Sequence, residues 1–193
     1  TESIPKMDMV CGPGNIFVTL AKKQLYGYTG IDGLYGPTET VVVADQSSNP
    51  VFCAADLLAQ AEHDSMATPI LVTTSKEFAR NVLAEIEKQI LTLERKKIAA
   101  TSLNNNGYIF VVKTINEIIN IVNLFAPEHL CLLNNDPEFI LKNIYNAGGI
   151  FVGEYSPEVV GDYTAGPSHT MPTGGTARFN SSLGVHNFIK YMP

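Results

Sequence analysis

Apolar and polar positions alternate along this 193-residue chain in two distinct ways. Short runs of apolar and β-branched residues predict strands at 40–44, 70–73, 108–112, 130–133 and 149–152. Longer segments that repeat apolar residues every three or four positions predict helices at about 50–63, 76–91, 115–125 and 137–145. Because strands and helices alternate, we predict an α/β protein of the Rossmann-like class, with a mostly parallel sheet and helices on both of its faces.

The part of the chain before this regular pattern is shorter and richer in glycine. Residues 6–11 predict a strand, and 16–26 predict a helix with Asn15 as its N-cap. Between them, Gly12, Pro13, Gly14 and Asn15 predict a turn. Residues 27–37 contain four glycines and indicate a hinge or a domain boundary.

An irregular stretch follows the last predicted strand. Residues 153–182 hold five glycines and three prolines and predict no regular element. Loops of this length within a compact domain are usually functional or disordered. Since this one carries Asp162, His169 and Arg178, we expect it to be functional.

Composition and charge exclude several classes of partner. With 45% hydrophobic and 17% charged residues, the chain has the composition of an ordinary soluble globular protein. The formal net charge of −6 gives no basic surface for nucleic acid or for an anionic membrane. The longest apolar run, 40–44, is far too short to cross a bilayer. We therefore expect neither a nucleic-acid partner nor a membrane.

The cysteines indicate a reducing compartment. Cys11, Cys53 and Cys131 are odd in number, far apart and in apolar surroundings. We expect three buried free thiols, not a disulfide framework or a zinc knuckle. The chain shows no signal peptide, and it begins with Thr1, which indicates a fragment or a processed product.

The predicted helix at 50–63 carries the first candidate for chemistry. Gln60 and His63 lie three residues apart and therefore on one helix face, with Asp56 two turns before His63 on about the same side. An amide, an imidazole and a carboxylate together could bind a ligand. The simpler interpretation is an amphipathic helix whose dipole favours His63 in its last turn. With no HExxH and no paired cysteines, the pattern alone favours the simpler interpretation.

Two further stretches contain candidate proton donors, acceptors or ligands. Glu128 and His129 are a natural acid–base pair placed at the start of a predicted strand, although Pro127 could equally mark an ordinary turn after a helix. Asp162, between Gly161 and Tyr163, could be a ligand or a turn residue of the irregular stretch.

Two other features are weaker candidates. The loop 12–15, between a strand and a helix, could hold a phosphate, but Pro13 removes an amide donor and the GxGxxG pattern is not met. A tight turn explains this loop as well. His186, beside Asn187 and Phe188, is interpreted as an ordinary surface histidine.

Taken together, several unusual stretches form one ordered pattern. They are Cys11-Gly12-Pro13-Gly14-Asn15, Gly36-Pro37-Thr38-Glu39, Asp56 to His63, Ala126 to Leu130, Asn146-Ala147-Gly148-Gly149, and Gly161 to Gly166 with His169, Pro172 and Thr173. In order and approximate spacing they resemble the central part of the histidinol dehydrogenase family over nearly the whole chain. Such a set is far more specific than any single motif.

The resemblance implies a zinc enzyme that oxidises L-histidinol to L-histidine through L-histidinaldehyde, in two NAD-dependent steps that end histidine biosynthesis. Gln60, His63 and Asp162 would then be zinc ligands, with one zinc ion per site. The metal would chiefly hold the substrate through its imidazole and amine.

The resemblance also assigns the catalytic residues. His129 would be the base in both steps, and Glu128 would help to activate the water that hydrates the aldehyde. Thr38 stands where the family usually has a substrate-contacting serine. Substrate would contact Thr38, Gln60, His63, His129 and Asp162, and NAD would meet Gly12, Pro13, Gly14 and Asn15.

By the same resemblance, residues 1–37 are the C-terminal remnant of a first Rossmann-like domain. Residues 38–178 form a second such domain, of the aldehyde-dehydrogenase-like type, and 179–193 begin a C-terminal segment. The parent protein would be a cytoplasmic homodimer in which the partner's C-terminal tail completes the site with a histidine and a glutamate. Without that tail and the N-terminal half, we expect this chain alone to be inactive.

Two alternatives remain open at this point. The chain could be a stand-alone metal-binding or scaffolding module without turnover. It could also resemble aldehyde dehydrogenases in mechanism, but that chemistry needs a nucleophilic cysteine in a polar loop. Cys11 is near such a loop, but it is predicted to end a strand.

Overall fold

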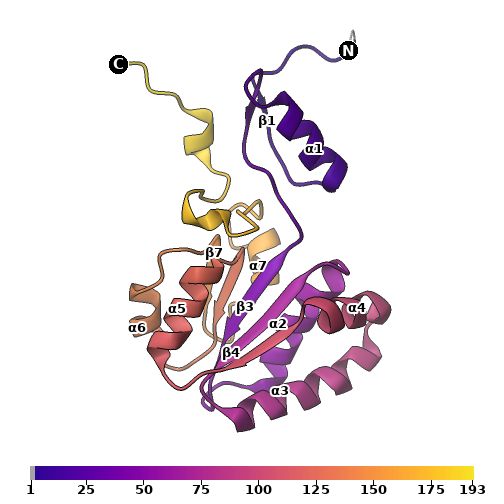
Figure 1. Ribbon diagram of the computed structural model, residues 1–193, viewed down its shortest axis with the longest axis vertical. Coiled ribbons are helices and arrows are strands. Elements are labelled where there is room, and N and C mark those ends of the chain that lie inside the picture. Colours follow the sequence, from indigo (N-terminus) through magenta and orange to yellow (C-terminus); the bar gives the residue numbers. More distant parts are fainter. Residues whose placement is uncertain (1–2) are drawn as a thin grey trace.

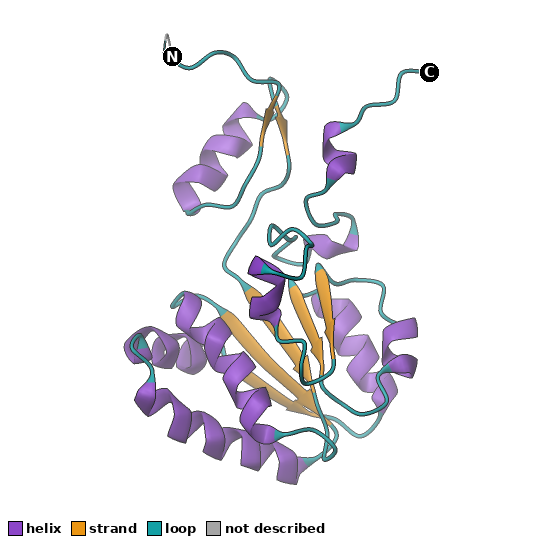
Figure 2. Ribbon diagram, turned by 180° about the vertical axis from the view of Figure 1, so that it is seen from behind, coloured by secondary structure: helices purple, strands orange, loops and turns teal. Residues whose placement is uncertain are grey.

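The computed structural model describes residues 3–193, and its main body is a parallel five-stranded sheet between two layers of helices (Figures 1 and 2). The strand order is β5-β4-β3-β6-β7. The strands are β3 (Glu39–Val43), β4 (Thr68–Thr73), β5 (Tyr108–Val111), β6 (His129–Leu132) and β7 (Gly149–Val152). The predicted fold class is confirmed, and each of the five strands predicted for this sheet begins and ends within two residues of its position in the structure.

Helices cover both faces of this sheet. The helices on one face are α2 (Pro50–His63), α3 (Lys76–Gln89) with the short η1 (Ile90–Thr92), and α4 (Lys96–Asn106). The helices on the other face are α5 (Ile115–Phe125) and α6 (Glu138–Lys142). Alternate strand residues point into the two layers: Val42 and Leu71 pack against α2 and α3, while Val41 and Ile70 pack against α5. Because the central strands are buried on both faces, their sequences are nearly continuous apolar runs.

The helix α4 was not predicted from the sequence. Its buried positions are Ala99 and Ser102, both fully enclosed. The Ser102 hydroxyl donates a 2.9 Å hydrogen bond to the carbonyl oxygen of Ala67, just before β4. Leu103 also packs against the core but is only partly buried. Since the buried side chains of α4 are small, the helix lacks the apolar periodicity that marks the other helices.

The N-terminal residues form a separate small unit above the main sheet in Figure 1. It consists of β1 (Met9–Val10), α1 (Ile16–Leu25) and β2 (Gly30–Ile31), with β1 and β2 paired in parallel. The predicted strand at 6–11 is thus only two residues long, and β2 lies inside the stretch predicted as a hinge. The domain boundary at residue 37 stays a prediction.

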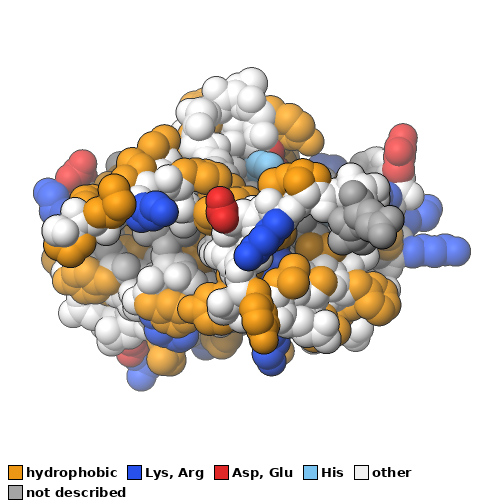
Figure 3. Space-filling model, turned by 90° about the horizontal axis from the view of Figure 1, so that it is seen from above, with side chains coloured by type: hydrophobic (Ala, Val, Ile, Leu, Met, Phe, Trp, Pro, Cys, Tyr) orange, Lys and Arg blue, Asp and Glu red, His pale blue; other side chains and the backbone are white. Residues whose placement is uncertain are grey.

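A buried ion pair stabilises this unit. Lys22 Nζ lies 2.6 Å from Asp32 Oδ1, with both side chains almost fully enclosed. The ammonium group also donates to the Gly12 carbonyl oxygen and lies 5.0 Å from the centre of the Tyr35 ring. Many apolar side chains of α1 are nevertheless exposed, including Ile16, Phe17 and Leu20. Figure 3, which looks at the end of the molecule that bears both termini, shows apolar side chains spread across that face.

The remaining elements lie near the amino ends of β3, β6 and β7. They are the short helix α7 (Glu158–Tyr163) and the single turns η2 (Thr176–Arg178) and η3 (Val185–Phe188). Three hydrogen bonds attach residues 173–182 to the amino ends of the strands: Gly36 N to Thr173 Oγ1 at 2.6 Å, Gly174 N to Glu39 Oε1 at 3.1 Å, and Ser182 Oγ to the Gly148 carbonyl at 2.9 Å. In residues 3–193, no helix combines the length and the apolar character that a membrane crossing needs.

Removing the cap of α5 is expected to destabilise the fold moderately. Thr114 Oγ1 accepts a hydrogen bond from Glu117 N, and the Glu117 carboxylate accepts one from Thr114 N, so the two residues form a reciprocal capping box. Thr114→Ala should lower the free energy of unfolding by about 1 kcal/mol, measured by urea denaturation. Thr101→Ala, an exposed threonine inside α4, is the control and should change it by less than about 0.5 kcal/mol. Equal effects of the two substitutions would contradict the role of the cap.

Candidate active site at the amino edge of the sheet

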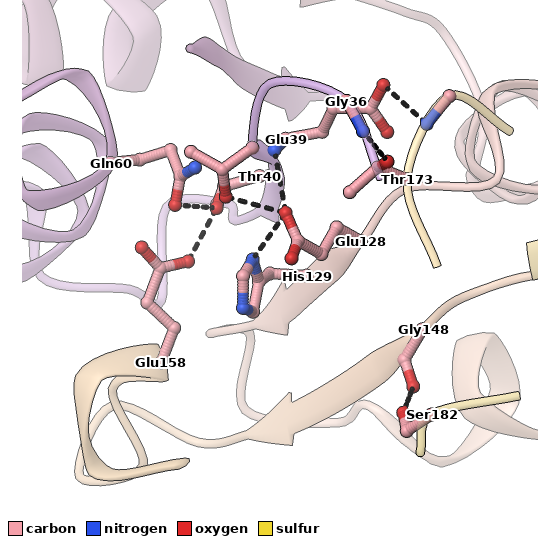
Figure 4. Close-up of polar contacts among 12 residues, drawn as sticks. Gly36, Glu39, Thr40, Gln60, Glu128, His129, Gly148, Glu158, Thr173 and Ser182 are labelled. Atoms are coloured by element: carbon pink, nitrogen blue, oxygen red, sulfur yellow. Dashed lines mark hydrogen bonds and ion pairs between the residues drawn. The ribbon is translucent and has the colours of Figure 1, made fainter. Parts of the chain in front are cut away.

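Polar side chains gather where the strands β3, β6 and β7 begin. The register pairs Thr40 of β3 with His129 of β6, and His129 with Gly149 of β7, so the first residues of these strands lie side by side. Glu128 directly precedes β6, as expected from the sequence. Most α/β proteins bind their ligands at the opposite edge, at the carboxyl ends of the strands. This site is instead formed by residues just before or at the start of the strands, such as Glu128, together with residues of the C-terminal part of the chain, such as Glu158 (Figure 4).

Glu128 is a buried carboxyl group held from two sides. Its Oε2 atom accepts a 2.6 Å hydrogen bond from Thr38 Oγ1 and a 3.2 Å hydrogen bond from the backbone N–H of Glu39. Burial nevertheless raises the pKa of Glu128 to about 7, because desolvation outweighs these two hydrogen bonds. A carboxyl group with this pKa can both hold and release a proton near neutral pH.

His129 lies beside this carboxyl group. Its Nδ1 atom is 3.8 Å from Glu128 Oε2 and, within residues 3–193, has no hydrogen-bond partner. Burial lowers the pKa of His129, so the imidazole is neutral at pH 7 and able to accept a proton. The ring packs at 5.9 Å from the Phe151 ring, centre to centre.

The glycine at position 148 allows the chain to pass close to this pair. A Cβ atom at Gly148 would lie 2.6 Å from the Glu128 carbonyl oxygen, which no real Cβ contact tolerates. The backbone N–H of Gly148 donates to Pro127 O at 2.9 Å, and that of Gly149 donates to Glu128 O at 2.8 Å. The glycine pair therefore fixes the backbone that carries Glu128.

The three residues that the resemblance implied as zinc ligands are in different environments. Gln60 is buried on α2, whereas His63, one turn later, and Asp162 are exposed. Asp162 was expected in an irregular loop, and this expectation was wrong: it lies in α7. Helix α7 is only six residues long and contains Gly161, so its sequence carries no helical signal. The charges of His63 and Asp162 both act on the pKa of His129, which places them near the same site.

Two residues of the site were missed by the sequence analysis. Thr40 and Glu158 are both buried, and Thr40 Oγ1 lies 2.5 Å from Glu158 Oε2 and 2.8 Å from Gln60 Oε1 (Figure 4). Burial raises the pKa of Glu158 to about 8. Thr40 is a polar residue at the head of a valine-rich strand, which was a signal for a buried polar partner. Nothing local distinguishes Glu158 from a surface glutamate.

The donor set fits zinc in kind. In the part of the chain that the structure describes, no three His, Cys, Asp or Glu side chains come close enough together to hold a metal ion. An imidazole and a carboxylate are nevertheless common zinc ligands, and Gln60 adds an amide. Gln60 Nε2 is buried with no hydrogen-bond partner among the described residues, while Oε1 lies against Thr40. An amide oxygen at that position would be free to bind a cation.

The loop 12–15 is an internally bonded turn. Gly12 N donates a 2.6 Å hydrogen bond to Asp32 Oδ2, and the Asn15 side chain accepts hydrogen bonds from Phe17 N and Val18 N. The predicted N-cap is confirmed. Because the Asp32 carboxylate occupies one of the loop's amide donors, the geometry does not favour a phosphate at that point. Pro13 and Gly14 remain exposed beside it.

None of the three cysteines has the environment of a thiolate nucleophile. Cys53 and Cys131 are buried, and burial raises the pKa of both thiols well above the usual range. Cys11 was expected to be buried, and this was wrong, because the residue follows the short β1 and is exposed. Desolvation, together with Asp32, raises its pKa too. Catalysis by a reactive cysteine therefore lacks support.

Comparison with known proteins gives first the fold class and then the family. An acetylating aldehyde dehydrogenase from Geobacillus thermoglucosidasius superposes with a TM-score of 0.59 at 14% identity, over 96% of this chain and 57% of that chain. At such low identity, the shared feature is the aldehyde-dehydrogenase-like fold. A family model described as Histidinol dehydrogenase matches residues 1–193. The chain belongs to the histidinol dehydrogenase family.

Individual relatives agree with this assignment. A histidinol dehydrogenase from Dehalococcoides mccartyi strain CBDB1 is 54% identical over 192 residues, and one from Caldanaerobacter subterraneus is 57% identical over 192 residues. Each alignment covers 100% of this chain, but only 44% and 45% of those relatives. The crystal structure of histidinol dehydrogenase from Elizabethkingia anophelis has a TM-score of 0.95 at 42% identity and covers 98% of this chain and 44% of that one. The chain thus spans less than half the length of the relatives it matches.

Proposed function

We propose that the natural protein containing this chain oxidises L-histidinol to L-histidine through L-histidinaldehyde, with NAD as the electron acceptor and zinc in the site. Family membership supports this reaction, and the Glu128–His129 pair is the observation that carries the mechanism. A neutral imidazole and a carboxyl group of pKa about 7 lie 3.8 Å apart at the site. We further propose a cytoplasmic homodimer whose partner contributes to the site.

His129 serves as the base in both oxidations. Removing a hydride from a primary alcohol requires that the hydroxyl proton leave as well, and a neutral imidazole accepts that proton near pH 7. In the second oxidation the oxidised species is the hydrated aldehyde, which again has a hydroxyl proton to lose. Nδ1 of His129, which has no hydrogen-bond partner within residues 3–193, is available to receive it.

Glu128 prepares the second oxidation. Adding water to the aldehyde requires a base that takes one proton from the water molecule, and the ionised Glu128 carboxylate does so. Thr38 Oγ1 and the Glu39 N–H both bind Oε2, so they hold the carboxylate in one orientation. Thr38 also keeps the hydroxyl of the family's usual serine and is proposed to contact the substrate.

The bound groups are assigned to residues of this chain as follows. Gln60, His63 and Asp162 would hold zinc, which supplies a positive centre that orients the imidazole and amine of the substrate. The loop 12–15, in which Pro13, Gly14 and Asn15 are exposed, would contact the NAD, which supplies the hydride acceptor. Because His63 and Asp162 are exposed, we propose that residues 1–193 by themselves are inactive and that the partner subunit completes the site.

The stoichiometry of NADH formation tests the proposed function. The intact natural protein, given limiting L-histidinol and excess NAD, should form two NADH for each histidinol consumed and release L-histidine. One NADH for each histidinol would indicate an alcohol dehydrogenase that stops at the aldehyde. No NADH would favour the alternative of a binding or scaffolding protein without turnover.

Removing Asp162 is expected to weaken zinc binding strongly. Even residues that only orient a metal ligand change metal affinity by about 10–100-fold, so loss of a ligand should lower it by at least about 100-fold. Zinc competition with a chromophoric chelator would compare Asp162→Ala with Asp45→Ala in the intact natural protein. Asp45 follows β3 at the opposite edge of the sheet, where its carboxylate binds Ser47, so its replacement should leave zinc affinity unchanged. Equal affinities of the two variants would remove Asp162 from the metal site.

A further inference from the structure

The hydroxyl group of Thr40 lies between two acceptor oxygens. Oγ1 is 2.8 Å from Gln60 Oε1 and 2.5 Å from Glu158 Oε2, and all three side chains are buried (Figure 4). A hydroxyl group has one proton and can donate only one of these hydrogen bonds. The other contact therefore needs a proton from Glu158 or from the Gln60 amide.

Two arrangements satisfy this count. In the first, a protonated Glu158 donates to Thr40, and Thr40 donates to the Gln60 oxygen. The Gln60 nitrogen is then a buried donor without an acceptor among residues 3–193. In the second, the amide is turned end for end: its nitrogen donates to Thr40, Thr40 donates to the Glu158 carboxylate, and the amide oxygen takes the unpartnered position. The two ends of an amide are nearly equal in shape, so the network decides between them.

Burial alone raises the pKa of Glu158 to about 8 and so favours the first arrangement. The positive charge of a cation at the site favours an ionised Glu158, and with it the second arrangement. A metal ion can bind an unpartnered amide oxygen but not an unpartnered amide N–H group. Gln60 lies one turn before His63 on the same face of α2, and Asp162 lies one turn after Glu158 in α7. The helix α7 thus supplies both a proposed ligand and the carboxylate that would orient another ligand through Thr40.

We propose that Glu158, acting through the Thr40 hydroxyl, holds the Gln60 amide with its oxygen turned toward the metal. This inference rests on the proposed function, which supplies the zinc. Thr40 and Glu158 are then positioning residues, because neither contacts the metal or the substrate. We call this chain of hydrogen bonds from Glu158 through Thr40 to Gln60 the relay. It joins β3, α2 and α7, and it favours the orientation in which the Gln60 oxygen faces the metal.

Zinc affinity and a cobalt spectrum test the role of Thr40. In the intact natural protein, Thr40→Val removes the hydroxyl at nearly constant shape and should lower zinc affinity about 10–100-fold, as loss of a group that orients a metal ligand does. Thr40→Ser keeps the hydroxyl and should restore affinity to within about threefold of natural. The visible absorption of bound Co²⁺ should change in the valine variant and not in the serine variant.

Thr73→Val is the matched control. Thr73 is also fully buried in a central strand, but it lies at the carboxyl end of β4, where its Oγ1 accepts a hydrogen bond from Ser75 N. This substitution should leave zinc affinity and the cobalt spectrum unchanged. If Thr73→Val lowers zinc affinity as much as Thr40→Val, the loss reflects general destabilisation and the proposal is overturned.

A double-mutant cycle tests whether Glu158 acts through Thr40. Glu158→Leu removes the acceptor oxygens that would hold the Thr40 hydroxyl, so it should lower zinc affinity about tenfold in the natural background. In the Thr40→Val background it should cause no further loss, because the relay is already broken. Independent, additive losses would overturn the relay, and so would full affinity in Glu158→Leu alone.

The outcomes separate this inference from the proposed function. If Thr40→Val binds zinc as tightly as the natural protein, and both form two NADH for each histidinol, the relay is wrong and the function stands. If the natural protein binds zinc but forms no NADH from histidinol, the proposed function is wrong. The zinc affinities of the Thr40 and Glu158 variants then still test the relay. Absence of zinc binding in the natural protein would overturn the relay as well.

Discussion

Replacing His129 with asparagine in the intact natural protein should lower kcat about 10²–10⁴-fold, the usual contribution of a general base. The loss should be similar whether the reaction starts from L-histidinol or from L-histidinaldehyde, because each oxidation releases a hydroxyl proton. Asparagine can fill much of the imidazole's space but cannot accept a proton near pH 7. Single-turnover formation of NADH from each substrate measures the two steps separately.

The matched control for this substitution is His186→Asn. His186 lies in η3 and is exposed, as expected for a surface histidine, and it has no place in the proposed site. Its replacement should change neither step. A His129→Asn variant that keeps more than about a tenth of the natural rate in either oxidation would contradict a single base for both.

The main sheet was predictable because its strands are buried on both faces. Val41, Val42 and Val43 are at most 1% exposed. A strand that is buried on both faces needs apolar residues at successive positions, so it is visible in the sequence as an apolar run. Helix α4 lacked this kind of signal, since its buried side chains, Ala99 and Ser102, are small, and Leu103, which also packs against the core, is only partly buried. A helix that packs through small side chains shows little hydrophobic periodicity, so it is hard to predict from the sequence.

The site was only partly predictable, for a different reason. Glu128 and His129 are neighbours in sequence, so their pairing could be proposed from the chain alone. The contact between Thr40 and Glu158 joins residues 118 positions apart, and only the fold brings them together. Asp162 was recognised as a candidate, but its helix was not, because α7 is stabilised by its position over the sheet edge more than by its own sequence.

The zinc assignment of Gln60 and His63 came from the resemblance, and the geometry adds a reason for one of the two residues. Amide oxygens are weak zinc ligands compared with carboxylates and imidazoles, so nothing in residue type suggests Gln60. Among residues 3–193 one end of the buried Gln60 amide has no partner, and if the amide is turned as proposed above, its oxygen takes that position. For His63, the structure shows an exposed imidazole at the end of α2.

Replacing Glu128 with glutamine should separate the two oxidations. The variant keeps the shape of the side chain, and its amide oxygen can still accept hydrogen bonds from Thr38 and from the Glu39 N–H. It cannot take a proton from water, so the rate from L-histidinaldehyde should fall about 100-fold, within the range for loss of a general base. The rate of the first oxidation, from L-histidinol, should fall less than about tenfold, since it needs no hydration. Equal losses in both steps would contradict this division of roles.

The pH dependence of the same variant provides an independent measurement. In the natural protein the aldehyde step should speed up as pH rises through about 7, where Glu128 ionises, and the glutamine variant should lose this dependence.

The free energy of unfolding of the natural protein should change with pH in the opposite direction. Because burial raises the pKa from 4.5 to about 7, the folded protein holds a proton on Glu128 that the unfolded chain has released, and stability falls as pH rises through that window. The variant removes this penalty, so at pH 8 it should unfold at no lower urea concentration than the natural protein. A slower variant that is also less stable at pH 8 would show that Glu128 acts through the fold and not as a base.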